Sequence, residues 1–306
     1  MSCVREATRM ENLMNASVVI ITYYRAYELR RLLNSLLKQV VKPIEVFVVD
    51  DTPTSEIEDV CIKYTTQFGR MNVDFVYFRK KPSERSVAIS RNIGAKNAHG
   101  DVVMFMNSDL ILYPDYVKKV LGVFSEYPEA LGVGSWIGSS SIHSFRGFRY
   151  YFDQTLKKFF SLVQNSVNSC KRFEYPIALT KTINCEWLLG GYMSFRRLVF
   201  SEFKFDENLR GLAWGEDYLF SSSVYQRYPK SLLLSPVAKY IHAHSEEGRS
   251  GAKEFDMKIR NAKYILTKLW GFEGLLIFSR QYLGLMFFGE VSKLKSKLMP
   301  KKVMAK

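Results

Sequence analysis

Short runs of apolar residues alternate, in the first third of the chain, with segments whose apolar residues recur every three or four positions. Residues 17–22 (SVVIIT), 45–49, 73–78 and 102–106 have the pattern of buried strands. The segments between these runs have the spacing of helices. The first is the stripe Leu29, Leu32, Leu33, Leu36, Leu37 and Val40, which ends before Pro43, and the others lie at about 54–68 and at about 86–98. Strands that alternate with helices predict an α/β fold with a mostly parallel sheet covered on both faces.

The pattern changes after about residue 131. Residues 183–195 have the pattern of strands split by Gly190-Gly191, residues 217–227 that of a helix, and residues 232–241 that of a strand. From about residue 252, apolar and basic residues mix in a helical pattern, so we expect a helical extension.

Polar side chains recur at the carboxyl-terminal ends of the predicted strands. They are Thr22, Asp50, Asp51, Asn107 and Asp109. Open α/β sheets bind their ligands at this edge, so we expect a binding site there.

The composition narrows the classes of function. The chain has 306 residues, 47% hydrophobic and 24% charged, which suits one large α/β domain or two lobes and excludes a disordered protein. Its four cysteines are scattered without a C-x-x-C pair, which argues against a zinc ribbon and favours a reducing compartment. The net charge of +14 favours a polyanionic partner: nucleic acid, an anionic membrane or a phosphate-rich substrate.

The last residues of the chain are strongly basic. Residues 291–306 hold six lysines and no acid. No apolar run reaches the roughly 18 residues of a membrane span, and residues 1–15 do not resemble a signal peptide. The mixed segment 273–302 could lie on an anionic membrane, or it could pack on the domain with a solvated tail. We expect a cytoplasmic protein, with the cytoplasmic membrane face as a candidate partner.

Four motifs, in order, resemble those of family 2 glycosyltransferases with the GT-A fold. They are SVVIITYYRAYELRRLLNSLL (17–37), VVDD (48–51), SRNIGAKNAHGDVVMFMNSD (90–109) and WGEDYLF (214–220), within a resemblance that covers roughly residues 17–245. The resemblance implies a mixed, mostly parallel, Rossmann-like sheet flanked by helices. It also implies a tail (1–14), a nucleotide-sugar-binding half (15–135), an acceptor-binding half with the catalytic base (136–250) and a helical basic extension (251–306).

The same resemblance implies a nucleotide site made of Thr22, Tyr24, Asp50, Asp51, Arg85, Arg91, Asn107 and Ser108. Asp51 would contact the nucleotide base, and the two arginines would lie near the pyrophosphate, because guanidinium groups suit phosphate. The residues alone leave alternatives open. The two aspartates could cap the following helix, and the arginines could form a solvated basic face.

Asn107-Ser108-Asp109 occupies the D-x-D position of the family, which implies a divalent cation, Mn²⁺ or Mg²⁺, on the donor diphosphate. Asp109 would bind the metal, and His242 or His244 would complete its shell, since residues two apart on a strand face the same way. Asn107 departs from the family, because an amide supplies no charge. An ordinary polar turn is the alternative.

Glu216-Asp217 matches the acidic pair of the family. Asp217 would be the base that deprotonates the acceptor hydroxyl, and Glu216 would position the acceptor, although both could simply cap a helix. The resemblance implies an acceptor floor of Trp187, Gly190, Gly191 and Trp214. A core tryptophan beside a hairpin turn is the alternative to that floor.

The function expected from these features is inverting transfer of a hexosyl or deoxyhexosyl group. The donor would be a UDP- or dTDP-linked sugar and the acceptor a glycan or lipid-linked saccharide. A nucleotidyltransferase is disfavoured, because it would need a Gly-rich loop after the first strand. This chain has TYYRAYELR there, without a glycine. A catalytically weak nucleotide-sugar-binding protein stays open because of Asn107. A nucleic-acid binder is disfavoured because no such motif is present. The sequence does not indicate the oligomeric state.

Overall fold

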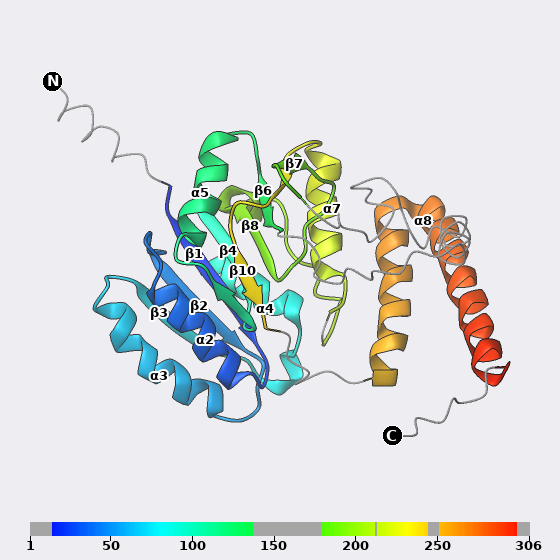
Figure 1. Cartoon of the computed structure of the whole chain (residues 1–306), viewed down its shortest axis with the longest axis horizontal. Coiled ribbons are helices and arrows are strands. Elements are labelled where there is room, and N and C mark those ends of the chain that lie inside the picture. Colours follow the sequence, from blue (N-terminus) through cyan, green and yellow to red (C-terminus); the bar gives the residue numbers. More distant parts are fainter. Residues whose placement is uncertain (1–13, 137–178, 212, 244–250, 299–306) are drawn as a thin grey trace, which may run out of the picture.

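The computed structural model describes residues 14–136, 179–211, 213–243 and 251–298 (Figure 1). In this part of the chain, one eight-stranded sheet has the order β3-β2-β1-β4-β8-β6-β9-β7. Helices cover both of its faces, and the helical segment α8 (Gly251–Leu298) lies beside α7 (Glu216–Arg227) (Figure 1). The mixed α/β architecture with a helical C-terminal extension is therefore confirmed.

The parallel half of the sheet consists of β1 (Ala16–Thr22), β2 (Glu45–Asp50), β3 (Asp74–Arg79) and β4 (Val102–Asn107). Every residue of β1 is buried, because the strand lies between β2 and β4 and both faces of the sheet are covered. Its side chains alternate between two cores, with Val18 and Ile20 on one side of the sheet and Val19 on the other. Burial on both sides explains the continuous apolar run in the sequence.

The second half of the sheet joins the first by antiparallel pairing. β8 (Tyr192–Arg196) lies antiparallel between β4 and β6 (Gly132–Ser135). β9 (Leu232–Ser235) pairs parallel with β6 and antiparallel with β7 (Ile183–Asn184). The single strand expected at 232–241 is wrong. After β9 the chain leaves the sheet, and β10 (Tyr240–His242) pairs antiparallel with β5 (Leu110–Leu112), which brings His242 opposite Leu110.

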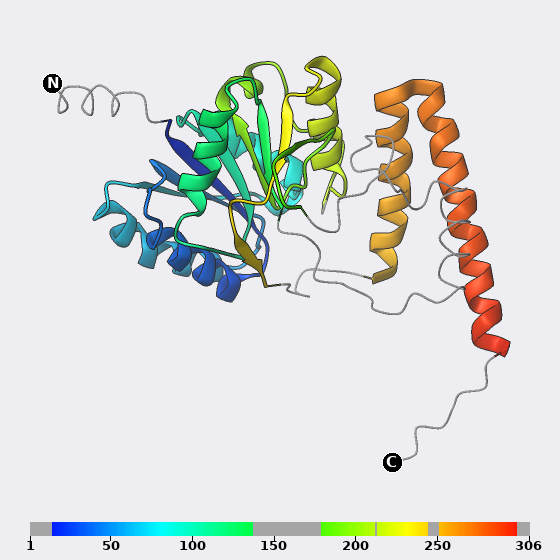
Figure 2. The same cartoon turned by 45° about the horizontal axis from the view of Figure 1, so that its top comes forward.

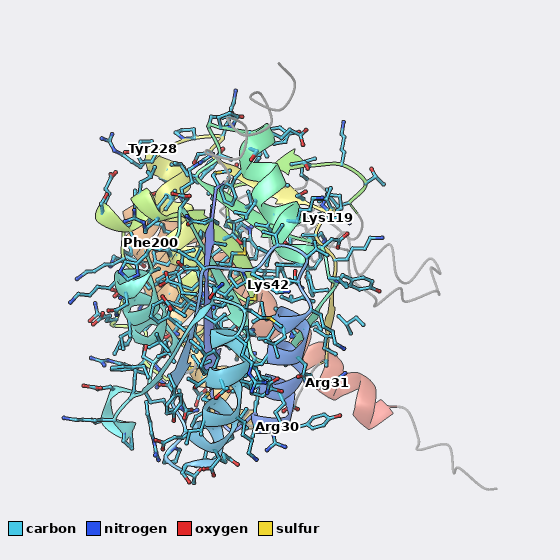
Figure 3. The ribbon with its side chains drawn as sticks, turned by 90° about the vertical axis from the view of Figure 1, so that its left-hand side faces the viewer. Arg30, Arg31, Lys42, Lys119, Phe200 and Tyr228 are labelled. Carbon is cyan, nitrogen blue, oxygen red and sulfur yellow. The ribbon has the colours of Figure 1, made fainter. Side chains whose placement is uncertain are left out.

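Two hydrophobic cores form, one on each side of the sheet. α2 (Ala26–Leu37), α3 (Glu56–Gly69) and α5 (Tyr116–Glu126) pack on one side. α4 (Val87–Asn97), α7 and the short helix η2 (Arg197–Ser201) pack on the other, and a second short helix, η1 (Pro82–Glu84), precedes α4. Figure 3 shows the two sides, with Lys42 and Lys119 on the first and Phe200 and Tyr228 on the second.

Two details differ from the sequence prediction. The helical stripe was expected to include Val40, but α2 ends at Leu37 and Val40 is 64% exposed. The backbone N–H of Val40 instead donates to the carbonyl of Pro114 at 2.8 Å, so the chain has already left the helix there. The prediction also lacks α5, β5 and β6, which continue the fold between β4 and the second half of the sheet.

α8 consists of two arms joined at Gly271, whose backbone is not helical (φ 55°, ψ −128°). The second arm lies on the far side of the first arm from the sheet, as Figures 1 and 2 both show. At Gly274 the arms approach closely, since a Cβ there would lie 1.8 Å from the carbonyl oxygen of Leu266. Among the described helices, none is long and apolar enough to cross a membrane.

Close packing of α4 on β1 fixes the helix that carries Arg91. A Cβ on Gly94 would lie 2.2 Å from Cγ1 of the buried Val19, which cannot move freely inside the sheet. We expect Gly94→Ala to lower the free energy of unfolding by about 1–3 kcal/mol, because an added methyl group overpacks this contact.

Gly122→Ala is a matched control on α5, because no atom lies within 4 Å of a Cβ there. Alanine is favoured over glycine inside a helix, so this variant should be neutral or more stable. Thermal unfolding followed by circular dichroism measures both. Equal melting temperatures for the two variants would contradict the packing of α4 on β1.

Candidate active site

A cleft of about 430 Å³ opens where β1, β2 and β4 end. It brings together most of the residues that the sequence singles out: Thr22, Asp51, Arg85, Arg91, Asn107, Ser108, Asp109, Gly190, Gly191, Trp214, Glu216, Asp217 and His242. Segments that are distant in the sequence thus meet at the predicted edge of the sheet. The roles of these residues stay predictions.

Asp51 is held at one side of the cleft by a buried lysine. The Lys80 ammonium lies 2.7 Å from Oδ1 of Asp51 and also donates to the carbonyls of Glu84 and Ser86, at 2.9 Å each. Burial raises the pKa of Asp51, and the hydrogen bond and charge of Lys80 oppose that shift. Nearby, the hydroxyl of Thr22 is buried and has no hydrogen-bond partner among the described residues. A polar ligand could therefore bond to both side chains.

Arg85 lies over an aromatic ring at the rim of the cleft. Its guanidinium carbon is 3.7 Å from the ring centre of Tyr23, in the loop after β1. The backbone of the Arg85 segment is fixed by Gly211, whose N–H donates to the carbonyl of Arg85 at 3.1 Å. The arrangement holds a cation at the cleft while leaving its in-plane N–H donors available for an anion.

Asp109 contacts two basic side chains. Its Oδ2 accepts a hydrogen bond from Nη1 of Arg25 at 3.0 Å, and its Oδ1 lies 3.2 Å from Nε2 of His242. Burial works against ionisation, but His242 and Arg25 outweigh it and hold the pKa of Asp109 below its ordinary value. The carboxyl group is therefore ionised at neutral pH.

The rest of the D-x-D position faces the same cleft. The backbone N–H of Asn107 donates to the carbonyl of Gly191 at 3.1 Å, and a Cβ on Gly191 would lie 3.0 Å from Nδ2 of Asn107. Glycine thus allows the two segments to approach closely. The buried hydroxyl of Ser108 has no hydrogen-bond partner among the described residues. These groups offer neutral donors and acceptors to a ligand.

Asp109 and His242 fit a divalent cation as two neighbouring ligands. They supply an oxygen and an imidazole nitrogen 3.2 Å apart, a combination suited to Mn²⁺. Within the described residues, no group of three or more His, Cys, Asp or Glu could hold a metal. A cation here would therefore need further ligands from the donor diphosphate or from water.

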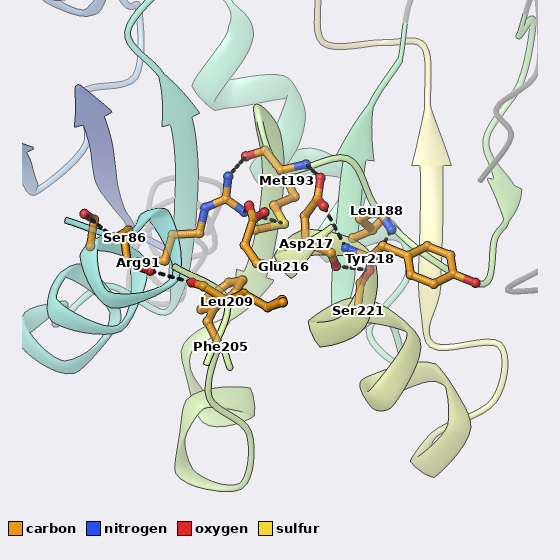
Figure 4. Close-up of polar contacts among 12 residues, drawn as sticks. Ser86, Arg91, Leu188, Met193, Phe205, Leu209, Glu216, Asp217, Tyr218 and Ser221 are labelled. Carbon is orange, nitrogen blue, oxygen red and sulfur yellow. Dashed lines mark hydrogen bonds and ion pairs between the residues drawn. The ribbon is translucent and has the colours of Figure 1, made fainter. Parts of the chain in front are cut away.

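Glu216 and Arg91 form a buried ion pair beneath the cleft (Figure 4). Nη1 of Arg91 lies 2.8 Å from Oε1 of Glu216, and Nη2 donates to the carbonyl of Gly190 at 3.0 Å. Burial raises the pKa of Glu216, and the charge of Arg91 opposes the shift. A Cβ on Gly190 would lie 2.4 Å from the guanidinium, so the glycine permits this packing.

Asp217 is the second residue of α7 and is oriented by backbone groups (Figure 4). Its Oδ2 accepts from the N–H of Gly190 at 2.6 Å, and its Oδ1 accepts from its neighbour Tyr218 at 2.8 Å. Within the described part of the chain, no lysine or arginine pairs with it, in contrast to Asp51, Asp109 and Glu216. Each oxygen keeps a further lone pair that can accept a proton.

Three predicted residues do not line the cleft. Asp50 is buried behind it, where it accepts from the N–H of Thr52 at 2.8 Å and from the hydroxyl of Tyr77 at 2.9 Å. Trp187 packs its ring edge-on against Tyr218 in the core, with ring centres 5.3 Å apart. Tyr24 lies outside the lining, and His244 falls outside the described residues.

Two basic residues of the cleft, Arg25 and Lys258, are not among the residues predicted from the sequence. Arg25 lies three residues after the end of β1, at the edge of the sheet where the sequence already predicts a binding site, so its position was a usable signal. Lys258 comes from the first arm of α8, and no spacing or motif in that helix marks it.

The model of the family described as "Glycosyl transferase family 2" matches residues 17–200. Among curated proteins, glycosyltransferase GlyA of Streptococcus pneumoniae is 25% identical over 72% of this chain and 29% of its own length. The glucosyl-dolichyl phosphate glucuronosyltransferase of Haloferax volcanii is 29% identical over 40% of this chain and 38% of its own. The chain thus matches well under half of the length of these relatives.

Solved structures share the fold. TarS 1–349 of S. aureus superposes with a TM-score of 0.58 over 94% of this chain and 77% of that one, at 18% identity. GalNAc-T7, solved with UDP, GalNAc and Mn²⁺, gives a TM-score of 0.62 over 85% of this chain and 48% of that one, also at 18% identity. The match to the family model over most of the sheet, together with this architecture, leads to one conclusion: the chain belongs to glycosyltransferase family 2 and has the GT-A fold.

Proposed function

We propose that this protein is an inverting glycosyltransferase that moves a hexosyl or deoxyhexosyl group from a UDP- or dTDP-linked donor to a hydroxyl of a glycan or lipid-linked saccharide. The observation that carries the proposal is that Asp51, Asp109 and Asp217, from three distant segments, line one cleft. Such a reaction would serve the synthesis of a cell-surface polysaccharide or a glycoprotein glycan.

In this proposal, Asp217 is the catalytic base. One of its carboxylate oxygens takes the proton of the acceptor hydroxyl as the hydroxyl oxygen bonds to the anomeric carbon. The bond from that carbon to the diphosphate breaks, and the diphosphate leaves with the electron pair. Backbone N–H groups fix the orientation of Asp217 without neutralising it, which suits a base.

The donor would lie across the ends of β1, β2 and β4. Asp51 and Thr22 offer hydrogen bonds to the nucleotide base, and Ser108 offers its buried hydroxyl to the ribose. Arg85 is the candidate for the diphosphate because its donors remain at the cleft. TarS was also solved with UDP-GlcNAc, and a UDP-linked donor is our first choice for this chain.

Asp109 and His242 would hold a divalent cation, Mn²⁺ or Mg²⁺, whose charge neutralises the leaving diphosphate. Support comes from their distance of 3.2 Å and from the ionised state of Asp109. Asn107 favours a second candidate function, a nucleotide-sugar-binding protein with little catalysis, because it removes one negative charge from the D-x-D position.

We expect Asp217→Asn to reduce transfer by about 100-fold or more, the usual contribution of a general base, while UDP binding is retained. The measurements are UDP release from a panel of UDP- and dTDP-sugars with Mn²⁺, and UDP binding by calorimetry. Asp59→Asn, an exposed acid on α3, is the control and should keep full activity.

Full activity of the Asp217→Asn variant would contradict the role of the base. A wild-type protein that binds UDP but releases none from any donor and acceptor would support the binding protein instead.

We further propose that the second arm of α8 lies on an anionic membrane, at the cytoplasmic face. Phe272, Leu276, Leu283 and Met286 recur at helical spacing and are between 51% and 74% exposed. The chain continues from this stripe into residues 291–306, with six lysines and no acid. Apolar side chains in the interface and lysines at the headgroups suit a peripheral helix.

We expect the full-length protein to co-sediment with vesicles that contain phosphatidylglycerol and not with phosphatidylcholine alone. The double variant Leu276→Ser/Leu283→Ser should lose this binding. Leu198→Ser is the matched control, because Leu198 is 62% exposed on η2, as Leu283 is on α8. Equal binding of the double variant and the wild type, or no binding of the wild type, would refute the membrane proposal.

A further inference from the structure

Arg25 forms an ion pair with the carboxyl group that the metal would need. Its Nη1 donates to Oδ2 of Asp109 at 3.0 Å, and the two side chains are 16% and 1% exposed. The other oxygen of Asp109 lies 3.2 Å from His242. The carboxylate therefore already has a strong cationic partner before any ligand binds.

The loop that carries Arg25 is fixed in an uncommon backbone conformation. Tyr24 has a φ of 54°, a left-handed value that is unfavourable for a tyrosine. The hydroxyl of Thr52, after β2, accepts the backbone N–H of Tyr24 at 2.9 Å and helps to hold this turn. Arg25 follows as the residue directly before α2, and its side chain lines the cleft. Strain of this kind is typical of positions with a functional constraint.

Arg25 and a divalent cation compete for the same carboxylate. Like charges within about 4–6 Å disfavour each other, so a cation between Asp109 and His242 is opposed by the guanidinium while Arg25 stays in place. A nucleotide diphosphate removes the conflict, because its two negative charges can bond to the cation and accept the guanidinium. Arg25 has N–H donors in a planar fork, which suits either a carboxylate or a phosphate.

We propose that Arg25 is a positioning residue that makes binding of the divalent cation conditional on the nucleotide diphosphate. Without nucleotide, Arg25 neutralises Asp109 and keeps the cation out. When cation and diphosphate enter together, Arg25 transfers from Asp109 to a phosphate oxygen. The inference rests on the proposed donor site and adds an order to it: the cation binds with the nucleotide and not before it.

The test measures Mn²⁺ binding to the full chain by the loss of the free-ion electron paramagnetic resonance signal, with and without UDP. The wild type should bind Mn²⁺ weakly alone and much more tightly with UDP. Arg25→Gln should bind Mn²⁺ alone about tenfold more tightly than the wild type, since a charge-assisted hydrogen bond no longer competes. The same variant should show a smaller effect of UDP on Mn²⁺ affinity, and by linkage of Mn²⁺ on UDP affinity.

Three further variants make the result specific. Arg30→Gln removes the same charge from an exposed position on the same helix and should behave as the wild type. Arg25→Lys keeps a cation near Asp109 and should leave Mn²⁺ binding without UDP weak, which separates charge from folding. Asp109→Asn, added to Arg25→Gln, should abolish the gained Mn²⁺ affinity.

Equal Mn²⁺ affinity of the wild type and Arg25→Gln, or an equal effect of UDP in both, would overturn the inference while the proposed donor site stands. Retention of the gained affinity after Asp109→Asn would overturn it as well, because the cation would then bind elsewhere. A wild type that does not bind UDP, with or without Mn²⁺, would overturn the proposed function and the inference with it.

Discussion

Buried carboxylates in this cleft need positive partners, and the fold around them provides these partners. An isolated charge is costly away from water, so a carboxylate persists there only when it is paired and hydrogen-bonded. Lys80 pairs with Asp51, Arg25 with Asp109, and Arg91 with Glu216. Asp217 differs, because its hydrogen bonds come from backbone N–H groups. This difference in partners is the basis for proposing Asp217, and not the paired acids, as the catalytic base.

One of the ion pairs, between Arg91 and Glu216, also connects the two halves of the sheet. Arg91 is carried by α4, which packs on β1 through Gly94, yet its guanidinium bonds to Glu216 at the start of α7 and to Gly190 before β8. Lys80 acts within the first half, where it connects Asp51 to the carbonyls of Glu84 and Ser86, just before α4. Because Arg91 and Glu216 are distant in sequence, the position of the Glu216 carboxyl group depends on the packing of α4 on β1.

The sequence predicts the elements whose pattern is set by burial alone. β1, β2 and β4 are mostly apolar because both faces are covered, and the polar residues at or just after their ends include Asp51 and Asp109. The family resemblance adds Asp217, which a helical pattern alone cannot separate from a cap. α5 could also have been predicted, since Val117, Val120, Leu121 and Phe124 have helical spacing.

Other features depend on tertiary contacts that no local pattern encodes. Asp50 and Asp51 are adjacent acids, but only Asp51 lines the cleft, because successive side chains of an extended chain point in opposite directions. The basic partner of each acid cannot be predicted from a local pattern either, since Arg25 and Asp109 are 84 positions apart in the sequence. The break between β9 and β10, which brings His242 to Asp109, follows from pairing with β5 and not from composition.

The helical extension is part of the site. Nδ2 of Asn261, in the first arm of α8, donates to the carbonyl of Trp214 at 3.0 Å, and a Cβ on Gly215 would lie 2.6 Å from Cδ1 of Ile265. Gly215 itself has a φ of 88°, so glycine is required there both for its backbone and for close packing. These contacts fix the turn that leads into Asp217. The turn before the proposed base is therefore packed against a helix that lies beyond the family match.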